Sequence, residues 1–393
     1  MELLGTNRVG TSVIQKIQNH LYDKLAIPFG VCLPNGNLYK FGNGDPAFTV
    51  TIKDQNTLSA VMRFDELSFA EAYINGRLEI EGSMWDVMRC REALSDMHPL
   101  HGLWRRMAPL IVGQLRTNKE AVADHYEYDS EFFLKFLDAT RCYSQALFEH
   151  DDEPLEMAQR RKLEFVVESC GLKPGDRVLD VGGGWGAFVE YAGRKGIQVT
   201  ALTIARQSEK FINNLIQQLQ LPCKVIYGDF YEHTSPEPYD AIAILGVMEH
   251  LPDYAAVVRQ FQRLLKPGGK IYLDASSFRE KYSKSTFISR YVFPGNHRYF
   301  CLHDFLAEIS KTSFEVNSVH NDRHSYYLTC REWGKNLESK REEIVNFWGE
   351  RVYRIFRLYL WGASHLFFNR SMDAFRVVLE RPGDKHPPHY LSA

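Results

Sequence analysis

A glycine-rich turn after a buried apolar run constrains the fold of this chain more than any other feature. Residues 178–186 read Val-Leu-Asp-Val-Gly-Gly-Gly-Trp-Gly, and a helical pattern follows. An apolar run that ends in glycines before a helix predicts a buried parallel strand and a tight turn below a helix N-terminus. Because glycine has no Cβ, Gly182, Gly184 and Gly186 let a ligand lie against the backbone. Asp180, at the strand end, is placed to pair with amino or hydroxyl groups of that ligand.

The segments around this turn predict an α/β fold with a parallel sheet. Strands alternate with helical patterns, and a Pro-Gly-Gly turn at 267–269 precedes the fifth strand. The glycine turn alone also fits a dinucleotide-binding Rossmann domain. The strand order together with the Pro-Gly-Gly turn resembles the class I S-adenosylmethionine (SAM) methyltransferases, which have a Rossmann-like sheet. The predicted strands cover residues 177–181, 199–203, 224–227, 241–245 and 270–273.

The length of the chain predicts two domains. It has 393 residues, and a hydrophobic content of 45% supports full cores. We expect a smaller α+β domain over 1–118 and a methyltransferase domain over 119–393. We interpret the smaller domain as a module for packing, dimerisation or membrane association rather than for chemistry. Its predicted elements are helices at 12–25 and 65–72 and strands at 38–41 and 48–52.

Charge and cysteine content exclude several classes of protein. The net charge of −2 shows no nucleic-acid footprint. The seven cysteines are scattered and include no Cys-x-x-Cys pair, which favours reduced thiols in a cytoplasmic protein and no metal site. No signal peptide is recognised, and no apolar run approaches the ~18 residues of a membrane span, so any membrane contact is expected to be peripheral. A small basic cluster at Arg105, Arg106, Arg116 and Lys119 is either solvated surface or a site that attracts phospholipid.

An unusually aromatic segment at 342–368 has two interpretations. Its aromatic residues recur at spacings of three, four and seven, which is typical of helices that bury an apolar face. That face either belongs to the core or forms the wall of a lipid tunnel. Because the segment follows the nucleotide-binding elements, we expect residues 275–380 to build part of the acceptor pocket.

Motifs spread along nearly the whole chain resemble the cyclopropane-fatty-acyl-phospholipid synthases and the related mycolic acid cyclopropane synthases. Residues 179–186 resemble the Leu-Asp-Ile-Gly-Cys-Gly-Trp-Gly of that family, and residues 291–294 resemble its Tyr-Ile-Phe-Pro. The N-terminal domain is a feature of the longer bacterial members. The other matching motifs are His125-Tyr126-Glu127, Tyr143-Ser144, a helix with Leu155-Glu156, Ala158-Gln159 and Lys162-Leu163, then Leu202-Thr203-Ile204, Glu249-His250 and Tyr326, seven residues before Trp333.

The resemblance implies SAM as the methyl donor. In this interpretation Asp229 accepts a hydrogen bond from the adenine amine and Phe230 stacks on the ring, whereas no acid stands at Thr203 to bind the ribose. Asp229 alone would also fit a helix N-cap. The SAM contacts implied by the resemblance are Tyr143, Ser144, Asp180, Gly182, Gly184, Trp185, Gly186, Thr203, Ile204, Gln207, Asp229 and Phe230.

Two of the four positions that hold a bicarbonate ion in the family differ in this chain. Gln145 and Asp274 stand in place of Cys and His, whereas Glu249 and Tyr326 are kept. Glu249 and Asp274 are expected to end adjacent parallel strands, where two carboxylates would repel bicarbonate. We therefore expect that bicarbonate is not used and that Asp274, with a pKa raised by burial and by the second carboxylate, is the base. Glu249 would orient or stabilise a cation and Tyr326 would position the substrate; the alternative role of Asp274 is a strand-end cap or a SAM contact.

By resemblance, the chain is expected to be a C-methyltransferase for cis double bonds in phospholipid acyl chains. Methyl transfer to the double bond gives a carbocation, and the altered base leaves open a cyclopropane or a methyl- or methylene-branched product. An amine N-methyltransferase of the same fold is one alternative, although the N-terminal domain and the aromatic tail count against it. A non-catalytic SAM- and lipid-binding relative is another, although the intact SAM signature counts against it. As in the longer relatives, we expect a homodimer at the inner face of the membrane.

Overall fold

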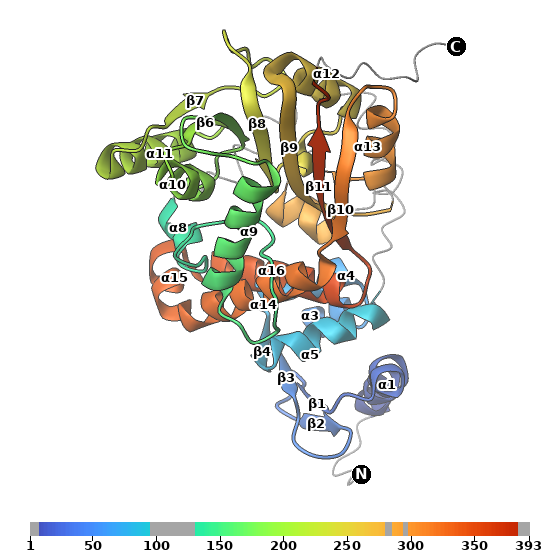
Figure 1. Cartoon of the computed structure of the whole chain (residues 1–393). Helices are drawn as coiled ribbons and strands as arrows, with labels where there is room; N and C mark the ends of the chain where they lie inside the picture. The colour runs from blue at the N-terminus through green and yellow to red at the C-terminus, as the bar shows by residue number, and fades with distance from the viewer. Residues whose placement is uncertain (1–7, 95–129, 280–284, 294–297, 384–393) are drawn as a thin grey trace.

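The described strands form two sheets, one within residues 29–82 and one within residues 177–380 (Figure 1). The computed structural model describes residues 8–94, 130–279, 285–293 and 298–383. The larger sheet has seven strands and the smaller has four. The expected domain boundary near residue 118, the motif at 125–127 and the basic cluster at Arg105, Arg106, Arg116 and Lys119 lie outside the described residues.

The seven-stranded sheet has the order β10-β11-β9-β8-β5-β6-β7, which confirms the predicted α/β Rossmann-like fold. Strands β5 to β9 run parallel, and β11 and β10 extend the sheet antiparallel. The chain moves outward from β5 to β7 and then crosses to β8, so the strand order reverses between β5 and β8. Ligands of such sheets bind beyond the carboxyl ends of the strands at this reversal. The strands are β5 (Arg177–Val181), β6 (Gln198–Thr203), β7 (Lys224–Tyr227), β8 (Tyr239–Leu245), β9 (Leu265–Ser277), β10 (Glu315–Asn321) and β11 (Asp373–Glu380).

The prediction that Asp274 ends the fifth strand is wrong. Strand β9 continues to Ser277, because β11 pairs with it along its whole second half. In this ladder Asp274 lies opposite Arg376, and Ser276 lies opposite Ala374. Asp274 therefore lies inside the sheet, whereas Glu249 follows the end of β8 in the short helix η3 (Met248–His250).

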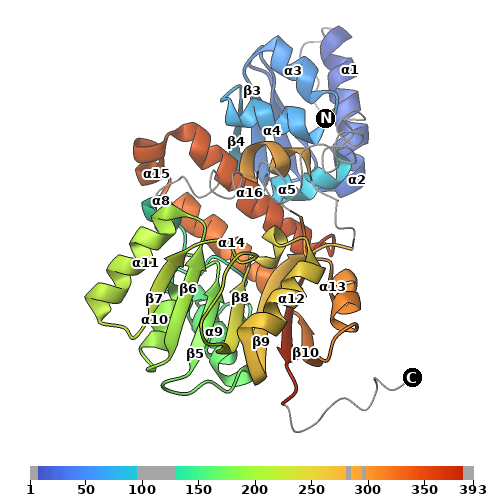
Figure 2. The same ribbon diagram turned by 90° about the horizontal axis from the view of Figure 1, so that it is seen from above.

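Helices cover both faces of the large sheet, as parallel strands require (Figures 1 and 2). One face packs against α9, α10 and α11, and the other against α12 and α13. Apolar residues on both sides of each strand make two separate cores, which explains the continuous apolar runs in the sequence. The helices are α9 (Leu155–Ser169), α10 (Ala187–Gly193), α11 (Arg206–Leu219), α12 (Tyr254–Leu264) and α13 (Leu302–Ile309).

A helical layer separates the large sheet from the N-terminal elements (Figure 1). The aromatic segment forms α15 (Arg341–Trp348) and α16 (Glu350–Phe368), and α16 packs along α14 (Arg323–Ser339). Short segments α8 (Ser130–Leu134) and η4 (Ile288–Val292) complete the layer. Among the described residues, no helix has the length and hydropathy needed to span a bilayer.

Residues 8–94, called the N-terminal half of the molecule below, contain the four-stranded sheet, with the order β2-β1-β3-β4. Asp54, Asp65 and Ser83 accept hydrogen bonds from the first turns of α3, α4 and α5 and so set where these helices begin. Arg354 of α16 is buried and donates to the carbonyls of Tyr73 (2.8 Å) and Leu78 (3.2 Å), which fixes this half against the helical layer. The elements are α1 (Arg8–Ile17), η1 (Gln18–Tyr22), α2 (Asp23–Leu25), β1 (Phe29–Cys32), β2 (Leu38–Phe41), β3 (Phe48–Ile52), α3 (Gln55–Val61), α4 (Glu66–Ile74), β4 (Leu78–Gly82), α5 (Met84–Arg89) and η2 (Cys90–Ala93).

Candidate active site

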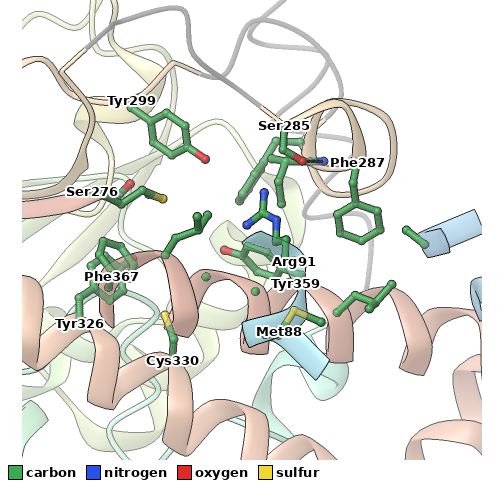
Figure 3. A pocket seen from close by; sticks show the side chains of 18 of the residues that line it. Met88, Arg91, Ser276, Ser285, Phe287, Tyr299, Tyr326, Cys330, Tyr359 and Phe367 are labelled. Atoms are coloured by element: carbon green, nitrogen blue, oxygen red, sulfur yellow. Dashed lines mark hydrogen bonds between the residues drawn. The ribbon is translucent and has the colours of Figure 1, made fainter. Parts of the chain in front are cut away.

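A large cavity lies where the carboxyl edge of the seven-stranded sheet meets the helical layer and the N-terminal half (Figure 3). Its empty volume is about 1170 Å³, part of it open to solvent. Ligand pockets are typically concave and mostly apolar, with a few polar groups that orient the ligand. The polar or charged residues that line this cavity are Glu66, Arg91, Tyr143, Glu249, His250, Ser276, Ser285, Tyr299, Tyr326 and Tyr359.

The aromatic C-terminal segment lies partly in the core and partly in the wall of the cavity, and its role as a lipid tunnel stays a prediction. Phe356 is buried in the core, whereas Tyr359 and Phe367 of the same helix line the cavity. Tyr326 of α14 stacks on Phe367, with ring centroids 4.5 Å apart. Phe347 of α15 has 74% of its surface exposed, so it contributes to neither. The helical layer thus forms an aromatic wall of the cavity.

Glu249 is a buried carboxylate in the wall of the cavity. Its Oε1 accepts hydrogen bonds from the backbone N and the Oγ of Ser276, both at 2.7 Å. Its Oε2 has no hydrogen-bond partner among the described residues. Burial raises the pKa of Glu249 to about 7, and the hydrogen bonds from Ser276 oppose this shift. A carboxylate with one oxygen held and a pKa near neutrality is suited to accept a proton.

Asp274 and Gln145 are absent from the described lining of the cavity. Asp274 is fully buried, accepts a hydrogen bond from the Tyr272 hydroxyl (3.2 Å) and lies 4.0 Å from the ammonium of Lys162. Gln145 is also fully buried and donates through Nε2 to Asp322 Oδ2 (2.9 Å). Of the four predicted catalytic residues, Glu249 and Tyr326 line the cavity, and Gln145 and Asp274 lie outside it.

The glycine turn after β5 fits a ligand that lies against the backbone. Gly182 has φ +100°, and a Cβ there would lie 2.4 Å from Cγ2 of Val247, so a side chain is excluded. At Gly184, by contrast, a Cβ would meet no atom within 4 Å, so this backbone borders open space. Gly186 precedes the first residue of α10 with φ +74°. Burial raises the pKa of Asp180, at the end of β5, to about 7, and the charge of Lys162 opposes this.

The other residues implied in SAM binding differ in how far they are buried and in which residues they contact. Tyr143 lines the cavity, and Ser144 and Trp185 are buried beside it. Ile204 is half-buried and Gln207 is exposed at the start of α11. Their contact with SAM stays a prediction. Three of the set have local partners: Thr203 Oγ1 accepts from the Ala205 amide (3.1 Å), Asp229 Oδ1 accepts from the Tyr231 amide (2.8 Å), and the ring of Phe230 packs near Phe261.

Sequence reasoning missed several polar groups of the cavity, among them Ser276 and Arg91. Ser276 holds Glu249, and Arg91 of η2 forms an ion pair with Glu66 of α4 (2.9 Å) that lines the cavity from the N-terminal half. Figure 3 shows Arg91 and Met88 entering the cavity beside Tyr359. None of these residues stands in a recognisable motif, since each partner is distant in the chain and is brought near by the fold. The N-terminal half, interpreted as a packing or association module, therefore also forms part of the cavity wall.

Comparison with known proteins identifies the family. Residues 113–377 match the family model of mycolic acid cyclopropane synthetase, and residues 16–97 match a domain of unknown function (DUF7884). A sphingolipid C9-methyltransferase of Candida albicans is 28% identical over 80% of this chain and 66% of its own length, so the chain spans just under two thirds of that relative. A cyclopropane-fatty-acyl-phospholipid synthase of Escherichia coli is 26% identical over 89% of this chain and 95% of its own.

A solved structure of mycolic acid cyclopropane synthase CmaA1, in complex with SAH and CTAB, is 27% identical with a TM-score of 0.62. The match covers 67% of this chain and 98% of that chain. The matched family model covers more than half of the chain, so the predicted resemblance is confirmed. The chain belongs to the mycolic acid cyclopropane synthetase family of SAM-dependent methyltransferases.

Proposed function

We propose that this protein transfers a methyl group from SAM to a cis double bond in the acyl chain of a membrane phospholipid. The observation that carries the proposal is the position of Glu249 in the wall of a mostly apolar and aromatic cavity. Its Oε2 has no hydrogen-bond partner among the described residues. Such a cavity suits a long apolar chain that must lose one proton. The two curated relatives, which are named for lipid acceptors, support the same substrate class.

The apolar walls address the first difficulty of the reaction, the weak nucleophilicity of an alkene. SAM supplies an electrophilic methyl group, and Asp180 with the glycine turn would hold it. The aromatic wall excludes water and fixes the acyl chain, so that the double bond is held in line with the methyl group. Positioning of this kind converts a slow encounter into a step within one complex.

The aromatic residues and Glu249 address the second difficulty, which is the positive charge left on the chain. The alkene electron pair would form the new carbon–carbon bond while the S–CH3 bond of SAM breaks, with its electron pair left on the sulfur of S-adenosylhomocysteine, and the neighbouring alkene carbon would become cationic. The rings of Tyr143, Tyr326 and Tyr359 face this region and attract a cation through their π faces. Burial holds the pKa of Tyr326 and Tyr359 well above the ordinary value, so both stay neutral donors.

Glu249 Oε2 then takes the proton that restores a neutral product. If the proton leaves the new methyl group of the first cation, its electron pair closes a cyclopropane. If a hydride first shifts to the cationic carbon, loss of a proton from the methyl group gives an exocyclic methylene. Loss of a proton from the acyl chain gives a methyl-branched alkene. We assign this role to Glu249 rather than to Asp274, because Lys162 faces Asp274 and the cavity does not. No bicarbonate ion is required in this proposal, because Gln145 and Asp274 replace two of the four residues that hold it in the family.

Mass spectrometry of phospholipids from cells that express the chain tests the proposal. The expected product is heavier than its precursor by one methylene group per modified acyl chain, and cells with Glu249→Gln lack it. With trideuteromethyl-labelled SAM in a cell-free assay, a ring or an exocyclic methylene keeps two deuteriums, and a methyl-branched alkene keeps all three. Catalytic hydrogenation then separates the methylene product, which takes up hydrogen, from the ring. Full activity in bicarbonate-free buffer is expected.

The alternatives predict other results of the same assay. Methylation of small amines without any change in phospholipid would identify an amine N-methyltransferase. Binding of SAM without turnover on either acceptor would identify a non-catalytic relative. The proposed homodimer and the location at the inner membrane face are tested by analytical ultracentrifugation and by flotation with phospholipid vesicles.

A further inference from the structure

A lysine ammonium lies fully buried beneath the wall of the cavity. Lys162 of α9 has no exposed surface, and its Nζ donates to Ser144 Oγ (2.6 Å) and Cys142 Sγ (2.8 Å). Its third neighbour is the Oδ2 of Asp274, at 4.0 Å. An ammonium has three protons to donate, and a buried one needs partners for them and a negative charge nearby. These four residues, Lys162, Asp274, Cys142 and Ser144, are called the lysine cluster below.

The lysine cluster is tied directly to the wall of the cavity. Ser144 follows Tyr143, which lines the cavity, and the Ser144 carbonyl accepts a hydrogen bond from Gln159 Nε2 (2.9 Å). A Cβ at Gly246, which also lines the cavity, would lie 2.7 Å from the Cβ of Ser144. A shift of Ser144 would therefore move Tyr143 and press on Gly246.

We propose that Lys162 is a positioning residue for methyl transfer and that Asp274 is its built-in counter-ion. The ammonium holds the turn of residues 142–144 against the end of β8, and the Asp274 carboxylate keeps the ammonium there. Asp274 thus acts through Lys162 and Ser144 and does not touch the substrate. This inference rests on the proposed function in that Tyr143 and Ser144 contact SAM and Tyr143 also faces the reacting chain.

The charges around the pair support this arrangement. Burial disfavours the charged form of Lys162, but the attraction of Cys142 and Asp274 outweighs it, so the pKa of Lys162 stays raised. Burial raises the pKa of Asp274, and the ammonium is the largest opposing influence. Truncation of one partner of a buried pair leaves the other uncompensated, which is costly.

Chemical rescue tests the proposal without any lipid. In Asp274→Ala the carboxylate is removed beside a fixed ammonium, and a small anion such as formate can replace it. We expect affinity for S-adenosylhomocysteine, measured by calorimetry, to fall about tenfold and to recover in formate. In the methyl-transfer assay kcat should fall about a hundredfold, as for other misplacements of about 1 Å, and recover in the same buffer.

Matched variants separate positioning from general stabilisation. Asp274→Asn keeps the shape of the side chain and leaves no room for formate, so formate should not restore the affinity for S-adenosylhomocysteine that this variant loses. Lys162→Met should also lose affinity, and no anion should restore it. Glu380→Ala removes another 4.0 Å ion pair, which joins Glu380 of β11 to Lys270 of β9, and should leave affinity and kcat unchanged. If folded Asp274→Ala binds S-adenosylhomocysteine as the parent does, or loses affinity that formate cannot restore, the proposal is overturned. Because the affinity assay needs no acceptor, a wrong lipid assignment would not affect it.

Discussion

Two buried polar regions lie at the same edge of the large sheet, and they are built differently. In the cavity wall, Glu249 has one oxygen held by Ser276 and the other without a partner among the described residues. In the lysine cluster, Asp274 Oδ2 faces an ammonium and the hydroxyl of Tyr272, and Oδ1 has no hydrogen-bond partner among the described residues either. Both carboxylates are almost completely buried. Burial alone therefore does not distinguish a reacting group from a supporting one.

The difference lies in what faces the carboxylate. Glu249 borders a space that an acyl chain can enter, so its proton affinity is available to a substrate. The charge of Asp274 is directed to Lys162, so its electrostatic effect is used within the protein. A raised pKa arises in both surroundings, and only the neighbours identify the one that serves as a base.

The largest expected effect comes from removing the proton acceptor in the cavity wall. Glu249→Gln keeps the shape and the hydrogen bond from Ser276 but cannot take a proton, so kcat should fall about 10²- to 10⁴-fold. Affinity for S-adenosylhomocysteine should change little, because the side chain faces the acceptor. The measurement is product formation on vesicles at saturating SAM. Retention of more than a tenth of kcat would assign the base elsewhere and remove the contrast between the two regions.

The pH profile should report the same carboxylate. Because burial raises the pKa of Glu249 to about 7, the group is protonated and inactive below that pH and becomes a base above it. The rate should fall about tenfold per pH unit below the pKa and level off above it. Saturating SAM is needed, since the pKa of Asp180 is also raised to about 7. A profile that is flat from about pH 5.5 to about pH 8.5 would contradict the assignment.

Local patterns predicted much of the fold. The strands expected at 38–41 and 48–52 have the same bounds as β2 and β3, because turn residues and alternating side chains mark them on both sides. The glycine turn and the strands around it were predicted for the same reason. In the site, Glu249 and Tyr326, which motif resemblance indicated, line one cavity, and their catalytic roles stay predictions.

Long-range pairing could not be predicted in this way. Strand β10 is largely exposed and has no apolar alternation, so only its pairing with β11 makes it a strand. The pairing of β11 with β9 extends β9 past Asp274, so Asp274 is not at the strand end. Lys162 appeared only as part of a helix motif, since its partner Asp274 comes from a distant strand. The distinction between the two carboxylates thus depends on contacts that no local pattern contains.

A smaller effect is expected when the support of Glu249 is weakened. Ser276→Ala removes the Oγ hydrogen bond, which lowers the pKa of Glu249 in the parent protein, while the backbone hydrogen bond remains. The midpoint of the pH profile should therefore move upward by about one unit, since a hydrogen bond to a charged group contributes ~1.5 kcal/mol. The rate at neutral pH falls accordingly and recovers at higher pH. An unchanged midpoint would show that Ser276 does not tune the base.

The smallest effect is expected at the part of the cavity wall formed by Arg91 and Glu66, which is called the N-terminal wall below. Arg91 and Glu66 form a partly exposed ion pair, and Glu66 also accepts a hydrogen bond from the Ser285 hydroxyl (3.2 Å). This part of the wall should influence how the lipid enters rather than how it reacts. Arg91→Gln should raise KM for vesicles about fivefold, equivalent to ~1 kcal/mol, and leave kcat unchanged. Arg89→Gln, which breaks an exposed pair with Asp86, is the matched control and should leave KM unchanged.

The double variant of the N-terminal wall decides how this pair acts. If Arg91 matters because its loss leaves Glu66 uncompensated, Arg91→Gln with Glu66→Gln should recover most of the KM, since neither charge is then left alone. If the guanidinium itself binds a polar group of the lipid, the double variant should be as weak as Arg91→Gln. A fall in kcat in either variant would instead place the N-terminal wall in the chemistry, and the N-terminal half would then be part of the reacting site in the same sense as the region around Glu249.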